Sequence, residues 1–240
     1  MIRSLMLMTE RLVFKIVAPL LSSRKARYAG SFVIQKYCKG HGAEIGAGVQ
    51  PVLVPIGSRT TYIDAVPAAF WRKIPQWANQ NVLDAEIIDE GATLSTVADE
   101  TFDYLIAAHV LEHIDDPILA LKNWVRVVKR GGHIVLAVPD MRLSDEQHRA
   151  LTSIDHLKRD HDEGPHVSAE YHYGEHGLNP EGYTGDKLAK YIKDHERMIH
   201  YHTFTLTSFV QFLGAMQDIG YELVEACLNV NEDLVVLSKT

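Results

Sequence analysis

Cysteine is scarce in this sequence: the 240 residues contain only Cys38 and Cys227. Two cysteines so far apart do not make a disulfide framework, which favours a reducing compartment. The sequence also lacks the run of about 20 nearly uninterrupted apolar residues that a transmembrane helix needs. It has no internal repeat and no low-complexity stretch, and its charged fraction of 23% is ordinary for a folded domain. We therefore expect a cytoplasmic globular protein.

Charge is distributed unevenly along the chain. Residues 1–40 hold eight Lys or Arg and one acid, Glu10, although the whole chain has a formal net charge of −7. Apolar residues recur at roughly helical spacing between Met1 and Leu21, and interspersed charges make a signal peptide a poor interpretation. We predict an amphipathic helical segment over residues 1–39, which either packs on the domain or contacts an anionic membrane surface peripherally. The acidic remainder argues against nucleic acid as a partner.

From residue 40 onward, short apolar runs alternate with helical patterns, as is typical of a parallel sheet with crossover helices. The predicted strands are Gly42–Ile45, Thr60–Ile63, Val82–Ile88, Phe102–Ala107, His133–Val138, Glu222–Asn229 and Asp233–Ser238. Three residues separate the last two strands, so this pair must be antiparallel. The predicted fold is α/β: a doubly wound, Rossmann-like, mostly parallel seven-stranded sheet with an antiparallel C-terminal hairpin strand.

Two helices are predicted with defined ends. Pro117–Val128 begins with a proline, carries one apolar stripe and is expected to end at the Gly131–Gly132 pair. Ser208–Ile219 is expected to be capped at its start by Thr205 or Thr207. Both helices are short enough to serve as crossovers in an α/β domain.

Residues 140–203 differ from the rest of the predicted domain, which spans residues 40–240. The stretch is polar and holds nine of the thirteen histidines. It is too long for a simple connecting loop, so structure of its own is expected. Because it leaves the carboxyl end of a predicted strand, where ligands bind in doubly wound sheets, we interpret it as an insertion that forms a substrate lid.

The strongest candidate for a ligand site is the turn Glu44-Ile-Gly-Ala-Gly48, which follows the first predicted strand. Its glycines, Gly46 and Gly48 around Ala47, let the backbone approach a ligand closely. Asp64 ends the second strand and is placed to bind ribose hydroxyls. The third strand ends at Asp89-Glu90, where a carboxylate suits an adenine amino group. The fourth strand runs directly into the polar segment His109-Val-Leu-Glu-His113.

In this order the elements resemble the class I S-adenosylmethionine-dependent methyltransferases. The resemblance rests on E-x-G-x-G, the acids after the second and third strands, "VLEH", "GGHIVLAVPD" and the closing hairpin, over about residues 40–140 and 203–240. It implies S-adenosylmethionine as the methyl donor. Glu44, Gly46, Ala47 and Gly48 would then lie near the methionine part, Asp64 at the ribose, Asp89 and Glu90 at the adenine, and His109 beside the cofactor. The pieces "VPD", "DEQHRALTSIDHL" and "HTFTLTSFVQFL" resemble a bacterial subgroup associated with cell-surface polysaccharide assembly.

One stretch departs from that family. Residues 49–55 contain Pro51 and Pro55 where a helix normally follows the glycine turn, so the first crossover is expected to be short or irregular. The rival interpretation, an NAD-binding Rossmann enzyme, requires G-x-G-x-x-G opening a helix, and the prolines argue against it.

Methyl transfer to a hydroxyl requires a base, and histidine titrates near neutral pH. His113, just past the fourth strand, is the first candidate, with His148 and His109 as alternatives. Arg142 and Arg149 could bind a carboxylate or phosphate on the acceptor. Three histidine groups of the predicted lid are each compatible with metal coordination: His161–His166, His172–His176 and His200-Tyr-His202. None has the spacing of a recognised zinc motif, so no metal ligand is predicted, and the sequence leaves open whether the lid binds a metal.

The predicted activity is O-methylation of a sugar or glycan, acidic or phosphate-bearing variants included. N- or C-methylation of a small molecule and an inactive cofactor-binding scaffold are the alternatives. The acceptor atom and the oligomeric state are left open by the sequence.

Overall fold

A computed structural model describes residues 32–75, 77–144, 146–164, 199–229 and 232–240, together with Tyr183, Thr184, Asp186, Lys187 and Lys190. The predicted N-terminal segment lies outside the described residues as far as residue 31, and so does most of the second half of the predicted lid. From Phe32 the chain forms a short helix, α3 (Phe32–Tyr37). Within the described residues, no helix is long and apolar enough to cross a membrane.

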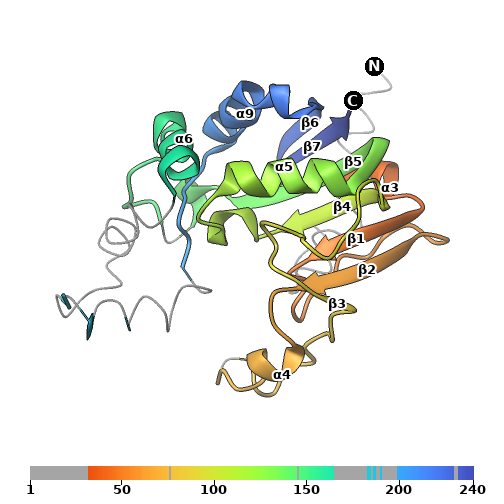
Figure 1. The fold of residues 1–240 in the computed structure, drawn as a ribbon, viewed down its shortest axis with the longest axis horizontal. Helices are drawn as coiled ribbons and strands as arrows, with labels where there is room; N and C mark the ends of the chain where they lie inside the picture. Colours follow the sequence, from red (N-terminus) through yellow and green to blue (C-terminus); the bar gives the residue numbers. More distant parts are fainter. Residues whose placement is uncertain are drawn as a thin grey trace, which may run out of the picture.

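The seven predicted strands form one sheet in the order β3-β2-β1-β4-β5-β7-β6 (Figure 1). The strands are β1 (His41–Ile45), β2 (Arg59–Asp64), β3 (Ile87–Ile88), β4 (Phe102–Ala108), β5 (Val128–Pro139), β6 (Tyr221–Asn229) and β7 (Glu232–Lys239). The first five pair in parallel, and β7 pairs antiparallel with both β5 and β6. This confirms the predicted doubly wound sheet with one antiparallel hairpin strand.

Helices cover both faces of the sheet. Figure 1 shows α5 (Pro117–Val127) crossing one face of the sheet. The helices α6 (Ile154–Glu163) and α9 (Leu206–Ala215) lie above α5 in this view. Alternate residues of β4 face opposite sides: Leu105 and Ala107 join the core under α5, whereas Tyr104 and Ile106 join the core under α3. Both faces of the central strands are therefore buried, as a parallel sheet requires. The remaining short elements are α4 (Ala68–Trp71), η2 (Leu111–His113), η3 (Met141–Leu143) and η5 (Gln217–Ile219).

The predicted helix Pro117–Val128 was correct to within one residue, but the glycine stop proposed for it was wrong. α5 ends at Val127, before the Gly131–Gly132 pair, because Val128 is already extended and pairs with Phe102 of β4. The glycine pair lies inside β5 instead. A Cβ on Gly132 would come within 2.6 Å of the Asp103 carbonyl oxygen, so glycine is required by the close approach of two strands.

The third predicted strand, Val82–Ile88, is also much shorter than expected. Only Ile87 and Ile88 pair with β2. Residues 81–85 are irregular because their backbone serves other partners: the Leu83 N–H donates to the Gly48 carbonyl, and Arg72 donates to the Val82 carbonyl. The segment therefore supports the glycine turn rather than extending the sheet.

Two other predictions were confirmed. Residues 46–58, between β1 and β2, contain no helix, so the first crossover is irregular as the prolines indicated. Thr205 caps α9 through a reciprocal pair of hydrogen bonds with Ser208. The predicted continuous helix to Ile219 is instead α9 followed by the 3₁₀ turn η5, and the chain then turns at Gly220 with φ 106°.

Candidate active site

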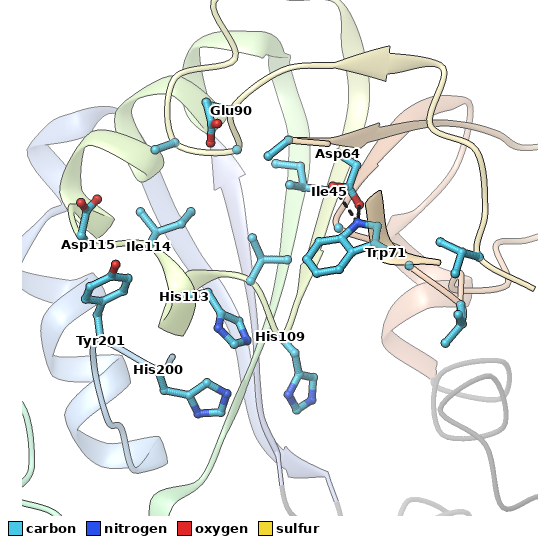
Figure 2. A pocket seen from close by; sticks show the side chains of 18 of the residues that line it. Ile45, Asp64, Trp71, Glu90, His109, His113, Ile114, Asp115, His200 and Tyr201 are labelled. Carbon is cyan, nitrogen blue, oxygen red and sulfur yellow. Dashed lines mark hydrogen bonds between the residues drawn. The ribbon is translucent and has the colours of Figure 1, made fainter. Parts of the chain in front are cut away.

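A pocket of about 610 Å³ lies at the carboxyl ends of the parallel strands. This is the edge where doubly wound sheets bind ligands. Figure 2 shows three histidines, His109, His113 and His200, gathered in one part of the pocket, with Asp64 and Trp71 in another. The lining also includes Ile45, Gly46, Gly48, Val49, Ala65, Trp77, Val82, Glu90, Gly91, Ala92, Val110, Ile114, Asp115 and Tyr201. The pocket thus joins a glycine turn, carboxylates and histidines from separate elements.

The glycine turn lines the pocket through Gly46 and Gly48. Both have left-handed backbone, with φ 64° and 54°, which glycine adopts without steric cost. The Gly46 N–H donates to the Ile63 carbonyl at 2.9 Å, which fixes the turn to β2. A Cβ on Gly46 would stand 3.0 Å from the Val110 side chain, so glycine lets the turn pack closely against Val110 at the pocket wall. Ala47 is at the tip of the turn and does not line the pocket.

Glu44 lies behind this turn rather than in the pocket. Its side chain is buried, and the Val52 N–H donates to both carboxylate oxygens at 3.1 and 3.0 Å. Val52 belongs to the proline-containing crossover. In a helix, its N–H would donate to a backbone carbonyl, but this crossover contains no helix. The Glu44 carboxylate therefore accepts the hydrogen bond that the irregular backbone would otherwise lack. Because Glu44 does not line the pocket, the structure does not show its predicted contact with the methionine part of a cofactor.

Asp64 does line the pocket, at the end of β2. Its carboxylate accepts from the Val66 N–H at 3.1 Å and from the indole Nε1 of Trp71 at 3.3 Å. Trp71 is in α4 and lines the same wall. Two donors from the protein hold the carboxylate in place, which is the preorganisation that binding of ribose hydroxyls requires.

The two acids after β3 have different surroundings. Asp89 is buried; its Oδ2 accepts from the Thr96 N–H and hydroxyl at 2.7 Å, and its Oδ1 accepts from Ser95 at 3.1 Å. Burial raises the pKa of Asp89, but these hydrogen bonds outweigh it and hold the pKa below its usual range. Asp89 thus shapes the loop over residues 90–99. Glu90, the next residue, is the acid that lines the pocket.

Side chains of α5 hold the same loop, residues 90–99, through hydrogen bonds to its carbonyl groups. The Trp124 indole donates to the Gly91 carbonyl at 2.7 Å, and Arg126 donates to the carbonyls of Leu94 and Val97. Because Trp124 is fully buried, the position of the Gly91 turn depends on the core. This loop is therefore held by the same packing that holds the sheet.

His109 is clamped between two buried carboxylates. Its Nε2 lies 2.7 Å from Glu232 Oε1, and its Nδ1 lies 3.3 Å from Glu112 Oε1. It is also one of three described residues other than glycine with positive φ, at 57°. Strained backbone of this kind is found where a side chain must point in a required direction. Glu112 and Glu232 hold the ring at the pocket wall.

His113 is held in one tautomer. Its Nδ1 lies 2.7 Å from the Ile199 carbonyl oxygen, and since a carbonyl only accepts, Nδ1 carries the proton. Burial lowers the pKa of His113, although the nearby Glu112 carboxylate opposes this effect. The ring is therefore neutral at pH 7, with a lone pair on Nε2.

His200 has a matching arrangement beside it. Its Nδ1 lies 3.0 Å from Glu146 Oε2, and its ring centroid is 4.5 Å from that of His113, with the rings nearly perpendicular at 81°. Glu146 in turn accepts from Arg149 at 2.6 Å. Burial raises the pKa of Glu146, but His200 and Arg149 outweigh it and keep this carboxyl ionised. Glu146 and Arg149 thus orient His200.

The remaining predicted residues do not line the pocket. His148 is exposed. Arg149 is buried, and besides Glu146 it donates to the Tyr201 carbonyl at 3.3 Å. Arg142 donates from Nε to Asp140 Oδ1 at 2.9 Å. Each predicted acceptor-binding arginine is therefore engaged with a carboxylate of the protein.

A cation-binding group was not predicted at this pocket. Among the described residues, one ligand atom each from Glu112, His113 and His200 lie within 4.8 Å of one another, so these three could hold a divalent ion. The sequence indicated His200 only through the His200-Tyr-His202 pattern. It contained no sign of Glu232, because that contact requires β7 to insert between β5 and β6.

A comparison with known protein families also indicates methyl transfer. Residues 43–136 match the family model described as a methyltransferase domain. This matched stretch includes the glycine turn, Asp64, Glu90 and both His109 and His113. This domain makes the chain an S-adenosylmethionine-dependent methyltransferase. No curated protein sequence matches the chain.

Three solved structures are similar to the methyltransferase. One is a Thermotoga maritima S-adenosylmethionine-dependent methyltransferase described as a possible histamine N-methyltransferase, with 14% identity, TM-score 0.47 and coverage of 95% of this chain and 99% of that chain. The CurJ carbon methyltransferase has 14% identity, TM-score 0.45 and coverage of 85% and 49%. A Rhodobacter sphaeroides protein assigned to the Zn-dependent alcohol dehydrogenases has 15% identity, TM-score 0.52 and coverage of 89% and 90%.

The last similarity concerns the fold alone, and the sheet separates this methyltransferase from NAD-binding Rossmann domains. Their sheets run parallel in the order 3-2-1-4-5-6. Here the antiparallel β7 lies between β5 and β6. The NAD-binding alternative is therefore excluded by topology as well as by the proline-rich crossover.

The residues at the pocket fit S-adenosylmethionine. The side-chain-free surface of Gly46 and Gly48 admits close approach, and the oriented Asp64 carboxylate suits a ribose. Among the described lining residues, three are acids, Asp64, Glu90 and Asp115, and none is Lys or Arg. An acidic pocket suits the positively charged sulfonium of the methyl donor.

Proposed function

We propose that this methyltransferase transfers a methyl group to a hydroxyl oxygen of a sugar or glycan. The reaction would take place in the cytoplasm, during assembly of a cell-surface polysaccharide, with His113 as the general base. The resemblance of "DEQHRALTSIDHL" and "HTFTLTSFVQFL" to a polysaccharide-associated subgroup supports the pathway. The pocket supports the chemistry.

The observation that carries this proposal is the pair His113 and His200. Each ring donates its Nδ1 proton to a fixed acceptor, the Ile199 carbonyl or the Glu146 carboxylate. Because Nδ1 carries the proton in each ring, Nε2 is the nitrogen that can accept a hydrogen bond in the neutral form, and both rings line the pocket. Two adjacent hydrogen-bond acceptors require a partner with two adjacent donors. Neighbouring hydroxyl groups of a sugar ring meet that requirement.

The charges at the pocket favour a neutral acceptor over an acidic one. Arg142 and Arg149 are both paired with carboxylates of the protein, and among the described lining residues there is no basic side chain other than histidine. A carboxylate or phosphate on the acceptor would face Asp115 and Glu90 without a compensating arginine. We therefore narrow the proposed acceptor to an uncharged hydroxyl-rich sugar.

His113 has the properties that the reaction needs from a base. S-adenosylmethionine supplies a methyl group on a sulfonium, a leaving group that needs no proton. The acceptor hydroxyl must lose its proton as its oxygen forms the new bond, and Nε2 of His113 is the lone pair placed to take it. Glu112, 1% exposed and adjacent in sequence, then stabilises the imidazolium that forms.

Two measurements test the proposal. Calorimetry with S-adenosylmethionine and S-adenosylhomocysteine comes first, because binding of neither would eliminate the methyltransferase assignment itself. Tritium transfer from labelled donor is then measured on neutral sugars, acidic sugars, amines and carbon acids. We expect transfer to neutral sugars, and transfer confined to amines or carbon acids would refute the O-methylation proposal.

Variants then test the base. His113→Gln keeps a polar side chain without the basic nitrogen, and we expect turnover to fall by about 10²- to 10⁴-fold with cofactor affinity retained. His148→Ala is the matched control, since His148 is an exposed histidine outside the pocket. If His148→Ala abolished turnover while His113→Gln did not, His148 would be the base. Turnover that required added Mg²⁺ or Mn²⁺ would instead indicate that His113 is a metal ligand.

A further inference from the structure

A second group of metal-ligating side chains lies outside the pocket. Ligand atoms of His156, Asp160 and His202 are all within 4.8 Å of one another. His156 and Asp160 are four residues apart on α6, so they project from the same face of that helix. His202 lies near the carboxyl end of the predicted lid, residues 140–203, shortly before α9. We propose that these three residues bind a divalent transition-metal ion, with zinc as the best match to the ligands.

The orientation of His202 is the one found in metal sites. Its Nε2 lies 3.2 Å from the Asp115 carbonyl oxygen, so Nε2 carries the proton and Nδ1 has the lone pair. That Nδ1 is buried. Metal-bound histidines typically donate their other ring nitrogen to a carbonyl or carboxylate, which fixes the tautomer.

The distances match a tetrahedral ion. His156 Nε2 and Asp160 Oδ2 are 3.0 Å apart. Bonds of about 2.0–2.1 Å to a tetrahedral zinc place two ligand atoms about 3.3 Å apart. The centroids of the His156 and His202 rings are 5.8 Å apart, and the rings are steeply inclined at 75°. Small side-chain movements would therefore bring all three ligand atoms onto one ion.

Burial makes a cation at this position favourable. Asp160 and His202 are each 1% exposed. A carboxylate this deeply buried needs a positive charge beside it. Arg159 donates to His156 Nδ1 at 3.3 Å, so the Nε2 proton of His156 faces Asp160. A divalent ion would replace that proton and place its positive charge beside the carboxylate. Two imidazoles with one carboxylate are also a ligand set typical of first-row transition metals rather than of Mg²⁺ or Ca²⁺.

An ion there would fasten three segments together. It would join α6 to residues 199–204 and, through the Asp115 carbonyl, to the turn before α5. The joined segment contains His200 and Tyr201, which line the pocket. The Tyr201 N–H also donates to the Glu112 carbonyl at 2.7 Å. The metal would thus hold the pocket wall formed by His200 and Tyr201 without contacting the reactants. This proposal therefore does not depend on which molecule accepts the methyl group.

The test uses cobalt as a spectroscopic substitute for zinc. The full-length protein is stripped of metal and titrated with Co²⁺, and we expect visible absorption at one equivalent that Zn²⁺ abolishes. Asp160→Asn and His202→Ala should each weaken Co²⁺ affinity by at least 10-fold. Zn²⁺ should also raise the Tm of the wild-type protein but not that of either variant.

Two control variants make the outcome specific. His161→Ala changes another histidine of α6, one that contacts Asp116 instead, and it should bind Co²⁺ normally. His113→Ala disrupts the other candidate group at the pocket and should also leave this binding unchanged. Absence of Co²⁺ binding at micromolar concentration would overturn the proposal. So would binding that His113→Ala abolishes and Asp160→Asn preserves.

Discussion

The buried acid pair Asp140 and Asp233 predicts an unusual dependence of stability on pH. Asp233 lies in β7 opposite Val138, and Asp140 directly follows β5. Both side chains are completely buried. Arg142 hydrogen-bonds Asp140 and holds its pKa below the usual range. Burial, together with the Asp140 charge, raises the pKa of Asp233 from 3.8 to about 7. Asp233 is therefore protonated in the folded protein at mildly acidic pH.

The sign and size of the effect follow from this pKa. A carboxyl whose pKa is raised on folding binds its proton more tightly in the folded state, so its contribution to stability is lost as pH rises from about 4 to about 7. A change from 3.8 to about 7, at 1.36 kcal/mol per pKa unit, corresponds to about 4 kcal/mol. Relaxation around the charged pair would reduce this to about 2–4 kcal/mol.

The perturbation that isolates the effect is Asp233→Asn, which replaces the protonated carboxyl with a group of the same shape that cannot ionise. Urea unfolding followed by circular dichroism is measured at pH 5, 6, 7 and 8 for both proteins. We expect the free energy of unfolding of the variant to gain about 1–3 kcal/mol on that of the wild type between pH 5 and pH 8, because about two of the roughly three pKa units of the change lie in this range. Asp84→Asn, at a carboxylate with an 80% exposed side chain, is the control. Parallel stability curves for wild type and Asp233→Asn would refute the reasoning.

Three further predictions concern the pocket. Burial lowers the pKa of His113 below 6.5, so the acid limb of the pH–turnover profile should lie below pH 6.5; a limb above pH 7 would contradict a neutral His113. Asp64→Ala should weaken S-adenosylmethionine binding in calorimetry by about 10- to 100-fold, because the carboxylate is the proposed ribose acceptor, and unchanged affinity would remove that role. Gly46→Ala should lower the free energy of unfolding by about 1–2 kcal/mol, because φ is 64° and Val110 is 3.0 Å from the new Cβ; a Tm equal to that of wild type would show that the turn relaxes.

Much of the fold followed from local patterns in the sequence. The strands and the antiparallel hairpin were predicted from apolar runs and from the length of one connection, because both signals lie within a few neighbouring residues. Pro51 and Pro55 correctly indicated an irregular crossover, and Thr205 correctly indicated the start of α9. The glycine turn and Asp64 were placed at one edge for the same reason, since successive parallel strands end on the same side of a sheet.

Which side chains face the pocket depends on packing between segments that are distant in the sequence. The sequence favoured Asp89 and Arg149, yet Asp89 is bonded to Ser95 and Thr96, and Arg149 is buried against Glu146. A side chain next to a strand end can turn toward the pocket or toward its own loop, and adjacent residues alone do not determine which.

For the two histidines after β4, the sequence predicts the position but not the orientation of the ring. The sequence placed His109 and His113 beside the pocket, because both follow the fourth strand directly. Their ring orientations depend on Glu232 and the Ile199 carbonyl, which are 123 and 86 residues away in the chain. The tautomer that leaves the Nε2 lone pair on His113 is therefore set by packing between distant segments, and the chemistry proposed for this pocket depends on that packing.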